Sequence, residues 1–389
     1  MSQLKRISIT KLTIGSYVQA VSKQLSSVKI VKTGWVRNKK AISELKREGV
    51  IEVIIDINKQ LETAQKDEAT EKESQQKKIT KSFEQELVSA KKLQDKMNTL
   101  LEATQKRILD NAPIDILALE QVAESIINSV TNHPHCLACL VRINHQKNSI
   151  LEHLQRVAIM LAQNMVFHKV SFSESVAVVL AGLTHDLGKL LLPVQLQQYE
   201  ALLTPQLRQK RLIYVKNTID ILKVSGGTPQ LTLKICYQQM ERLNGSGYPK
   251  KLTADSLPKI SKLFAIIDEF DSLTSGFEGN KIALIDKAHQ ALMLQSPTIF
   301  DKNLLQSFIK TTGLYIAGSL VKLKTGKIGY IKEFKHEIPM KPIVHCFFNA
   351  QFDHHIEAKD IDLSGEFIND SIESTVDPKQ FQLNLSDYI

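Results

Sequence analysis

Residues 184–189 read THDLGK and follow the segment ESVAVVLAGL, in which only the first two residues are polar. An apolar segment of this kind predicts a buried helix, and His185 and Asp186 stand at or near its end. A polar side chain buried there must be hydrogen-bonded, paired or bound to a metal. The stretch therefore predicts a helical core that carries a polar site.

Two more polar residues occupy similar positions elsewhere in the chain. His153 lies in LEHLQRVA and Asp268 lies in AIIDEFDSLTS, each inside or at the end of an apolar helical segment. Two imidazoles and two carboxylates suit a divalent transition metal such as iron, manganese or zinc. Lys189 follows His185 by one turn, so its ammonium would neutralise a phosphate bound to that metal. The alternative is a hydrogen-bonded core cluster, because a lone histidine in an apolar helix is usually a core residue.

Composition limits the class of protein. The chain has 389 residues, of which 43% are hydrophobic and 23% charged, which is ordinary for soluble proteins of two or three domains. Its start has no segment of signal-peptide type, and no apolar run approaches the length that spans a bilayer. Four cysteines are too few for a disulfide framework in a chain of this length. We therefore expect a cytoplasmic protein with no membrane partner.

Changes in composition and periodicity predict four parts. Residues 1–58 alternate short apolar runs with turn signals and predict a small α+β domain, whereas residues 59–83 are polar and predict a solvated linker or an exposed helix. Apolar residues recur every three or four positions through 84–312, which predicts an all-helical domain. Residues 313–389 contain three strand-like runs and predict a short C-terminal β element and tail. The predicted fold class is therefore mainly α, with small β-containing parts at both ends.

Positive charge is concentrated near the N-terminus. The net charge is +9, and residues 1–58 hold 11 Lys/Arg against 4 Asp/Glu. Such a surface can dock an acidic partner or a nucleic acid. Tyr17 and Trp35 are its only tyrosine and tryptophan, so no aromatic interleaving accompanies the charge. A solvated surface is the simpler interpretation, and a nucleic-acid partner is not expected.

Residues 240–249 read MERLNGSGYP and predict a tight loop. Gly245 and Gly247 permit unusual backbone angles, and Pro249 fixes the turn. Tyr248 can pack this loop without taking part in any chemistry. The loop can therefore persist as architecture after a site has changed.

Together, THDLGK, ERLNGSGYP and AIIDEFDSLTS resemble the HD-GYP family of HD-superfamily phosphohydrolases, over residues 148–331. Residues 1–58 resemble the small domain that precedes HD-GYP domains in one subgroup. The resemblance implies an HD-type helical bundle, two or three bound metals, and hydrolysis of the bacterial messenger cyclic di-GMP. The residues that match one metal site are His153, His185, Asp186 and Asp268, with Asp186 and Lys189 as the catalytic pair.

The chain departs from the family at the second metal. Family members have a ligand histidine in the segment that reads IYVKNTIDIL here, and Tyr214 takes its position. The family pattern HHE-R-x-DG becomes QMERLNG, which puts Gln239 and Met240 in place of two histidines. A glutamine and a methionine are a poor ligand pair for one iron or zinc. The basic run after DSLTS is also reduced to Lys281, so we expect one divalent metal and no second one.

Three functions stay open. The first is a degenerate HD-GYP protein with lost or weak phosphodiesterase activity, which acts by binding cyclic di-GMP, a related nucleotide or a signalling protein. The second is an active phosphodiesterase or phosphohydrolase that works at a one-metal site. The third is a nucleic-acid adaptor, which only the basic N-terminal charge supports.

Overall fold

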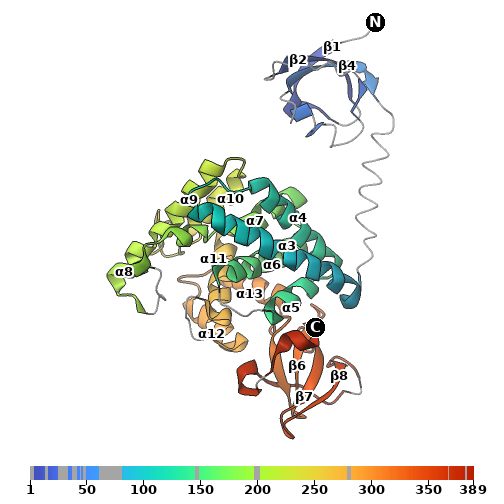
Figure 1. Cartoon of the computed structure of the whole chain (residues 1–389), viewed down its shortest axis with the longest axis vertical. Helices are drawn as coiled ribbons and strands as arrows, with labels where there is room; N and C mark the ends of the chain where they lie inside the picture. The colour runs from blue at the N-terminus through green and yellow to red at the C-terminus, as the bar shows by residue number, and fades with distance from the viewer. Residues whose placement is uncertain are drawn as a thin grey trace. The chain divides into compact units, whose positions relative to one another are not determined.

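The computed structural model describes residues 4–13, 16–24, 34–36, 42–43, 45–46, 50–60, 81–144, 149–196, 202–277, 282–366, 368–381 and 383–389. The chain divides into two compact units, residues 1–79 and 80–389, and Figure 1 draws both. Residues 61–80 of the predicted linker lie outside the described residues, as does Lys281. The four-part division of the chain stays a prediction.

The N-terminal unit is an antiparallel sheet with its own apolar core. The strand order is β1–β4–β2–β3. Val18, Val50 and Val53 are buried in this core. Residues 42–43 and 45–46 are helical, so the unit is α+β as predicted. The strands are β1 (Leu4–Ser8), β2 (Ser16–Gln24), β3 (Gly34–Trp35) and β4 (Val50–Gln60).

Helices make up most of the second unit, which confirms the mainly α prediction. They are α3 (Phe83–Leu109), α4 (Ile116–Asn132), α5 (Cys136–Ile143), α6 (Ile150–Phe167), α7 (Phe172–Thr184), α8 (Pro205–Arg211), α9 (Ile213–Ser225), α10 (Gln230–Gln238), α11 (Lys259–Ser275), α12 (Ile285–Gln295) and α13 (Lys302–Thr312). Phe264, Phe270 and Phe308 are fully buried in one core that most of these helices share. Among the described residues, none of the helices combines the length and the apolar character that a membrane crossing needs.

A five-stranded antiparallel sheet follows the helices, in the order β8–β7–β6–β5–β9. Its strands are β5 (Leu320–Leu323), β6 (Lys327–Glu333), β7 (Ile343–Asn349), β8 (His354–Asp362) and β9 (Ile372–Thr375). Tyr330 and Phe347 belong to the helical core, so the sheet packs on the helices (Figure 1). The sequence predicted three of these strands. It missed the edge strand β8, most of which is exposed and has no apolar alternation, and the four-residue strand β9.

Helices α6 and α7 lie in close backbone contact. A Cβ atom on Gly182 would stand 2.7 Å from Cα of Ala158, which is closer than real Cβ contacts. A larger residue would push the two helices apart. Because α6 carries His153 and α7 ends just before His185, the spacing of these helices sets the spacing of the two imidazoles.

The start of α6 and the end of α7 determine where the ligand residues stand on these helices. Ser149 and Glu152 form a capping box, so α6 starts at Ile150 and its first turn ends at His153. Helix α7 ends at Thr184, and a short 3-10 helix, η2 (Leu187–Leu191), continues the chain in a new direction. The change of helix type presents consecutive side chains to the same centre.

We expect the Gly182→Ala variant to lower the free energy of unfolding by about 2 kcal/mol, because overpacking between fixed elements typically costs 1–3 kcal/mol. Urea denaturation followed by circular dichroism measures this change. Ser173→Ala, on the exposed side of α7, is the control and should change stability by less than about 0.5 kcal/mol. Equal effects of the two substitutions would contradict the close packing of α6 on α7.

Candidate metal centre

Four side chains from three regions of the chain meet inside the helical unit. His153 comes from α6, His185 and Asp186 from the junction of α7 with η2, and Asp268 from α11. The two imidazoles are completely buried, Asp186 is 1% exposed and the Asp268 side chain is 14% exposed. The structure thus brings together the four residues that the sequence predicted as ligands of one metal.

The facing atoms of these residues are close. The Nε2 atoms of His153 and His185 are 3.2 Å apart, and Oδ1 of Asp268 is 3.0 Å and 3.2 Å from them. Oδ2 of Asp186 lies 3.6 Å and 3.8 Å from the same two nitrogens. One ligand atom from each residue therefore falls within 4.8 Å of all the others.

The second nitrogen of each imidazole is already used. Nδ1 of His153 lies 2.8 Å from Oδ2 of Asp271, and Nδ1 of His185 lies 3.0 Å from the carbonyl oxygen of Gly182. A carbonyl or an ionised carboxylate can only accept, so each Nδ1–H donates. Metal-binding histidines typically donate their other N–H in this way, which leaves the Nε2 lone pair for the cation.

The residues fit a single divalent transition metal. Two imidazole nitrogens and two carboxylate oxygens form a ligand set that suits iron, manganese or zinc. Oδ1 of Asp186 is buried and has no hydrogen-bond partner among the described residues, and an unsatisfied buried acceptor is costly. A cation would supply the missing partner. Among the described residues, this is the single group of histidine, cysteine and acidic side chains that meets the spacing of a metal site.

A proton on His153 compensates the negative charge of the neighbouring carboxylates when no metal is bound. Burial disfavours the charged form of His153, but its hydrogen bonds to Asp268 and Asp271 outweigh burial and raise its pKa from 6.5 to about 9. Burial acts to raise the pKa of Asp268, but hydrogen bonds from His153 and His185 hold it well below 3.8. A metal must therefore displace a proton from the cluster.

Asp271 and Arg156 form a relay behind His153 that the sequence analysis did not identify. Nε and Nη2 of Arg156 donate to the two carboxylate oxygens of Asp271 at 2.8 Å and 2.9 Å. Both residues are buried, and the Arg156 charge is the main factor that lowers the pKa of Asp271 against the effect of burial. The spacing in the sequence could have indicated this pair. Asp271 follows Asp268 by three positions and Arg156 follows His153 by three, so each lies on the same helix face as a predicted ligand.

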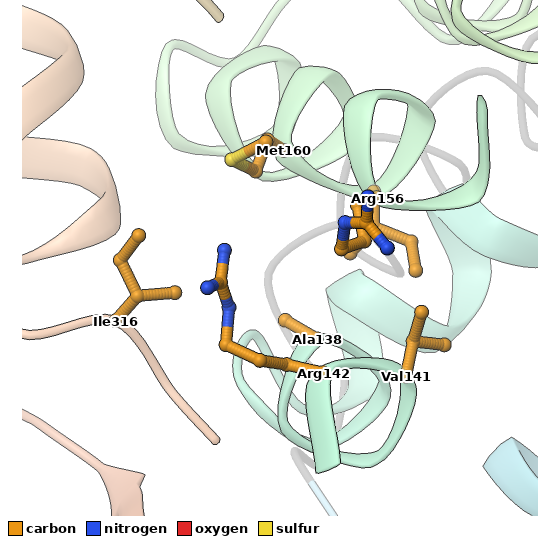
Figure 2. Close-up of a pocket in the computed structure, with 7 residues that line it drawn as sticks. Ala138, Val141, Arg142, Arg156, Met160 and Ile316 are labelled. Atoms are coloured by element: carbon orange, nitrogen blue, oxygen red, sulfur yellow. The ribbon is translucent and has the colours of Figure 1, made fainter. Parts of the chain in front are cut away.

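A small pocket adjoins this relay. Figure 2 shows Arg142 and Arg156 among apolar neighbours that include Met160 and Ile316. The cavity measures about 10 Å³, which is room for about one water molecule. Burial lowers the pKa of Arg142 to about 10, with Asp271 acting in the opposite direction. The pocket is therefore too small for a nucleotide and forms part of the packing around the relay.

The three positions where the sequence predicted lost histidines are taken up by other contacts. Tyr214 is 3% exposed and packs in an apolar cluster with Leu192 and Leu196. Gln239 is fully buried, and its Nε2 donates to the carbonyl of His185 at 2.7 Å. Met240 contacts the same apolar cluster as Tyr214. The Gln239 Oε1 atom has no hydrogen-bond partner among the described residues and remains as a neutral acceptor.

The loop at 240–249 is held by hydrogen bonds to the residues that follow it directly. The Glu241 carboxylate accepts from the backbone N–H of Lys250 at 2.6 Å and of Leu252 at 2.8 Å. A Cβ atom on Gly247 would stand 2.4 Å from Cα of Glu241, so the turn requires glycine. Gly245 has a φ of +74°, and Tyr248 packs on the cluster that contains Tyr214. These contacts account for the loop without any ligand.

The class of protein follows from fold and site: a helical domain with two histidines and two aspartates at a buried centre. Residues 138–304 match the HD domain, and residues 4–119 match a domain of unknown function, DUF3391. The match to the HD domain lies within the helical unit and includes all four residues of the centre. The chain resembles the HD-GYP family, as the sequence motifs predicted.

Proteins that are similar to this chain include two that are named as cyclic dinucleotide phosphodiesterases. The cyclic di-GMP phosphodiesterase PA4108 of Pseudomonas aeruginosa is 26% identical over 366 residues, which cover 90% of this chain and 86% of that protein. The 3'3'-cGAMP-specific phosphodiesterase 2 of Vibrio cholerae is 26% identical over 166 residues, 42% of this chain and 32% of that protein. The solved structure of Bd1817, an HDG"Y"P protein from Bdellovibrio bacteriovorus, covers 79% of this chain and 98% of that chain, with a TM-score of 0.46 and 16% identity.

We expect the Asp271→Asn variant to bind Mn²⁺ about 10- to 100-fold more weakly, because partners that orient a metal-binding histidine typically contribute that much to affinity. Isothermal titration calorimetry on the full chain measures the change. The control is Glu269→Gln on the same helix, whose carboxylate contacts Arg242 instead of His153. An unchanged affinity in Asp271→Asn would contradict the relay.

Metal binding should depend on pH with a definite sign. Because the pKa of His153 is raised from 6.5 to about 9, its proton is held up to that pH and must leave when a cation binds. We expect the apparent Mn²⁺ affinity to rise about tenfold per pH unit up to about pH 9 and then level off. Calorimetry in buffers of different ionisation enthalpy should detect the release of about one proton. Binding without proton release at pH 7 would contradict this account.

Proposed function

We propose that this protein is a degenerate HD-GYP protein of bacterial cyclic dinucleotide signalling, with one divalent cation and lost or weak phosphodiesterase activity. It acts by binding a nucleotide such as cyclic di-GMP, or a signalling protein. The match to the HD domain and the name of the relative that spans most of this chain support the signalling role. The two relatives act on different cyclic dinucleotides by name, so the ligand is proposed at the level of that class.

The observation that carries the proposal is the environment of Gln239. Its amide nitrogen is committed to the His185 carbonyl, which Thr218 Oγ1 also contacts at 2.9 Å. Both bonds satisfy a carbonyl at the end of α7, where helical partners run out. Gln239 therefore offers a second cation only its neutral Oε1 oxygen, which has no hydrogen-bond partner among the described residues and is a weaker ligand for iron or zinc than an imidazole nitrogen.

The chemistry left to a one-cation centre is limited. A bound divalent cation supplies positive charge to a phosphate oxygen. His153, His185, Asp186 and Asp268 would hold it, while Asp271 keeps the His153 tautomer fixed. Phosphoryl transfer also needs an activated nucleophile and a stabilised leaving oxygen. Loss of one such electrostatic element typically costs on the order of 10²–10³ in rate.

The second candidate is a one-metal phosphodiesterase or phosphohydrolase. The complete set of four ligands favours it, and so does the proximity of Lys189 to Asp186. In this case the cation and the Lys189 ammonium would neutralise the phosphate together. Both candidate functions require one bound cation, but only the one-metal enzyme requires hydrolysis of the nucleotide.

We expect protein purified without oxygen to contain one equivalent of metal, and to turn over cyclic di-GMP at least about 100-fold more slowly than PA4108 assayed in parallel. Elemental analysis and chromatography of the nucleotide measure the two quantities. The His185→Ala, Asp186→Ala double variant is the control for residual activity. Slow turnover that disappears in the double variant would favour the one-metal enzyme.

Two tightly bound metals with turnover comparable to PA4108 would contradict the degenerate function. Nucleotide binding without turnover would support a receptor. If the folded protein binds one metal but no cyclic dinucleotide, its role is protein interaction alone.

A further inference from the structure

Phe277 covers one face of the His153 imidazole. The two rings stack with 4.1 Å between their centres and an angle of 9°, and Phe277 is 5% exposed. Nζ of Lys189, which lies 2.6 Å from Oδ2 of Asp186, is 4.9 Å from the centre of the Phe277 ring. The ring therefore lies beside two of the predicted metal ligands, His153 directly and Asp186 through its lysine partner.

The end of helix α11 places this ring. Gly276 has a φ of +71°, a left-handed conformation that favours glycine and turns the chain back after Ser275. The Ser275 hydroxyl donates to the carbonyl oxygen of Asp271 at 2.7 Å and accepts from the backbone N–H of Phe277 at 3.2 Å. Because Asp271 also accepts from Nδ1 of His153, one helix end supplies both the hydrogen-bond partner and the cover of the same imidazole.

The other imidazole is covered by the helical core. The His185 ring meets Phe264 edge to face, with 5.0 Å between the ring centres, and Phe264 is a fully buried member of the core. Both imidazoles are themselves completely buried, so a phosphate reaches their Nε2 atoms only if a covering side chain moves. Phe264 can move only with the core around it, whereas Phe277 follows the last residue of α11 and lies outside the core cluster of the described residues. Phe277 is therefore the cover that can open.

We propose that Phe277 closes the centre to phosphate groups, so that a bound cation meets a phosphodiester only when this ring is displaced. The inference rests on the one-cation function proposed above, and it adds a cause of low turnover that does not depend on the second metal. The HD-GYP family has a basic run in the segment after DSLTS, whereas this segment begins with Gly276 and Phe277 here. The face of an aromatic ring is partially negative and donates no hydrogen bond, so it does not attract an anion.

Displacement of the ring has a free-energy cost. It exposes the apolar surface of Phe277 to water and separates the ring from the Lys189 ammonium. The burial of one phenylalanine side chain is sufficient to keep the open form at least about tenfold less populated than the closed form. Removal of the ring should therefore increase the access of phosphate by at least this factor.

The test is phosphorus-31 NMR of inorganic phosphate with the full chain loaded with Mn²⁺, because this paramagnetic ion broadens the signal of phosphate that contacts it. We expect Phe277→Ala to broaden the signal at least about tenfold more than the wild type. Phe277→Leu keeps an apolar side chain of similar size and should stay within about threefold of the wild type. Calorimetric titration with Mn²⁺ gives the number of bound ions in each protein, and thermal unfolding shows whether each variant is folded.

Phe277→Val takes the place of Phe277→Ala if the latter does not fold, and the same direction of change is expected because its side chain is also too short to cover His153. A ring that only supports His153 predicts weaker Mn²⁺ binding in Phe277→Ala and no access of phosphate. Equal broadening by the wild type and the loaded variant, whether both signals are broad or both are sharp, would overturn the role of Phe277. Two tight Mn²⁺ equivalents in the wild type would overturn the one-cation function alone, and a wild type that binds no Mn²⁺ would overturn both.

Discussion

Two imidazoles and two carboxylates lie within 4.8 Å of one another in the interior of a helical unit, and this arrangement requires a positive charge at its centre. Several local features bring the four side chains to this centre and fix their orientation. The close packing of α6 on α7 brings the two imidazoles together, the change from α7 to η2 presents His185 and Asp186 to one centre, and Asp271 fixes the His153 tautomer. A proton on His153 is stabilised by the neighbouring carboxylates when no cation is bound, and a divalent metal would be attracted by the carboxylates of Asp186 and Asp268.

The residues beside the four-residue cluster, where the HD-GYP family has the ligands of its second metal, are of other types. Gln239 bonds to the backbone, and Met240 and Tyr214 pack in an apolar cluster. The loop at 240–249 is stabilised by Glu241, which accepts from the backbone N–H of Lys250, and by the close backbone approach at Gly247, neither of which involves a metal. Architecture and chemistry can therefore diverge within one domain, and the shape of this loop is weak support for catalysis.

Periodicity and motifs were sufficient to predict the helical fold and the four clustered residues, because each lies in a long apolar segment with a strong helical pattern. They did not predict the relay, although Asp271 and Arg156 stood in the quoted segments. A pairing between two helices depends on which faces meet, and one sequence does not specify that. Phe277 was missed for a similar reason: it stacks on His153 from the segment after DSLTS, which the sequence analysis considered only for the basic run that the family has there. Strand β8 was missed because its exposed residues show no apolar alternation.

The central claim is the proposal that this centre holds one cation, whereas the HD-GYP family that the chain resembles holds two or three. Anomalous diffraction from crystals grown with excess Mn²⁺ tests it most directly. The account predicts a single anomalous peak enclosed by His153, His185, Asp186 and Asp268, with the Lys189 ammonium on the other side of Asp186. A second peak of comparable height that shares Asp186 would contradict it.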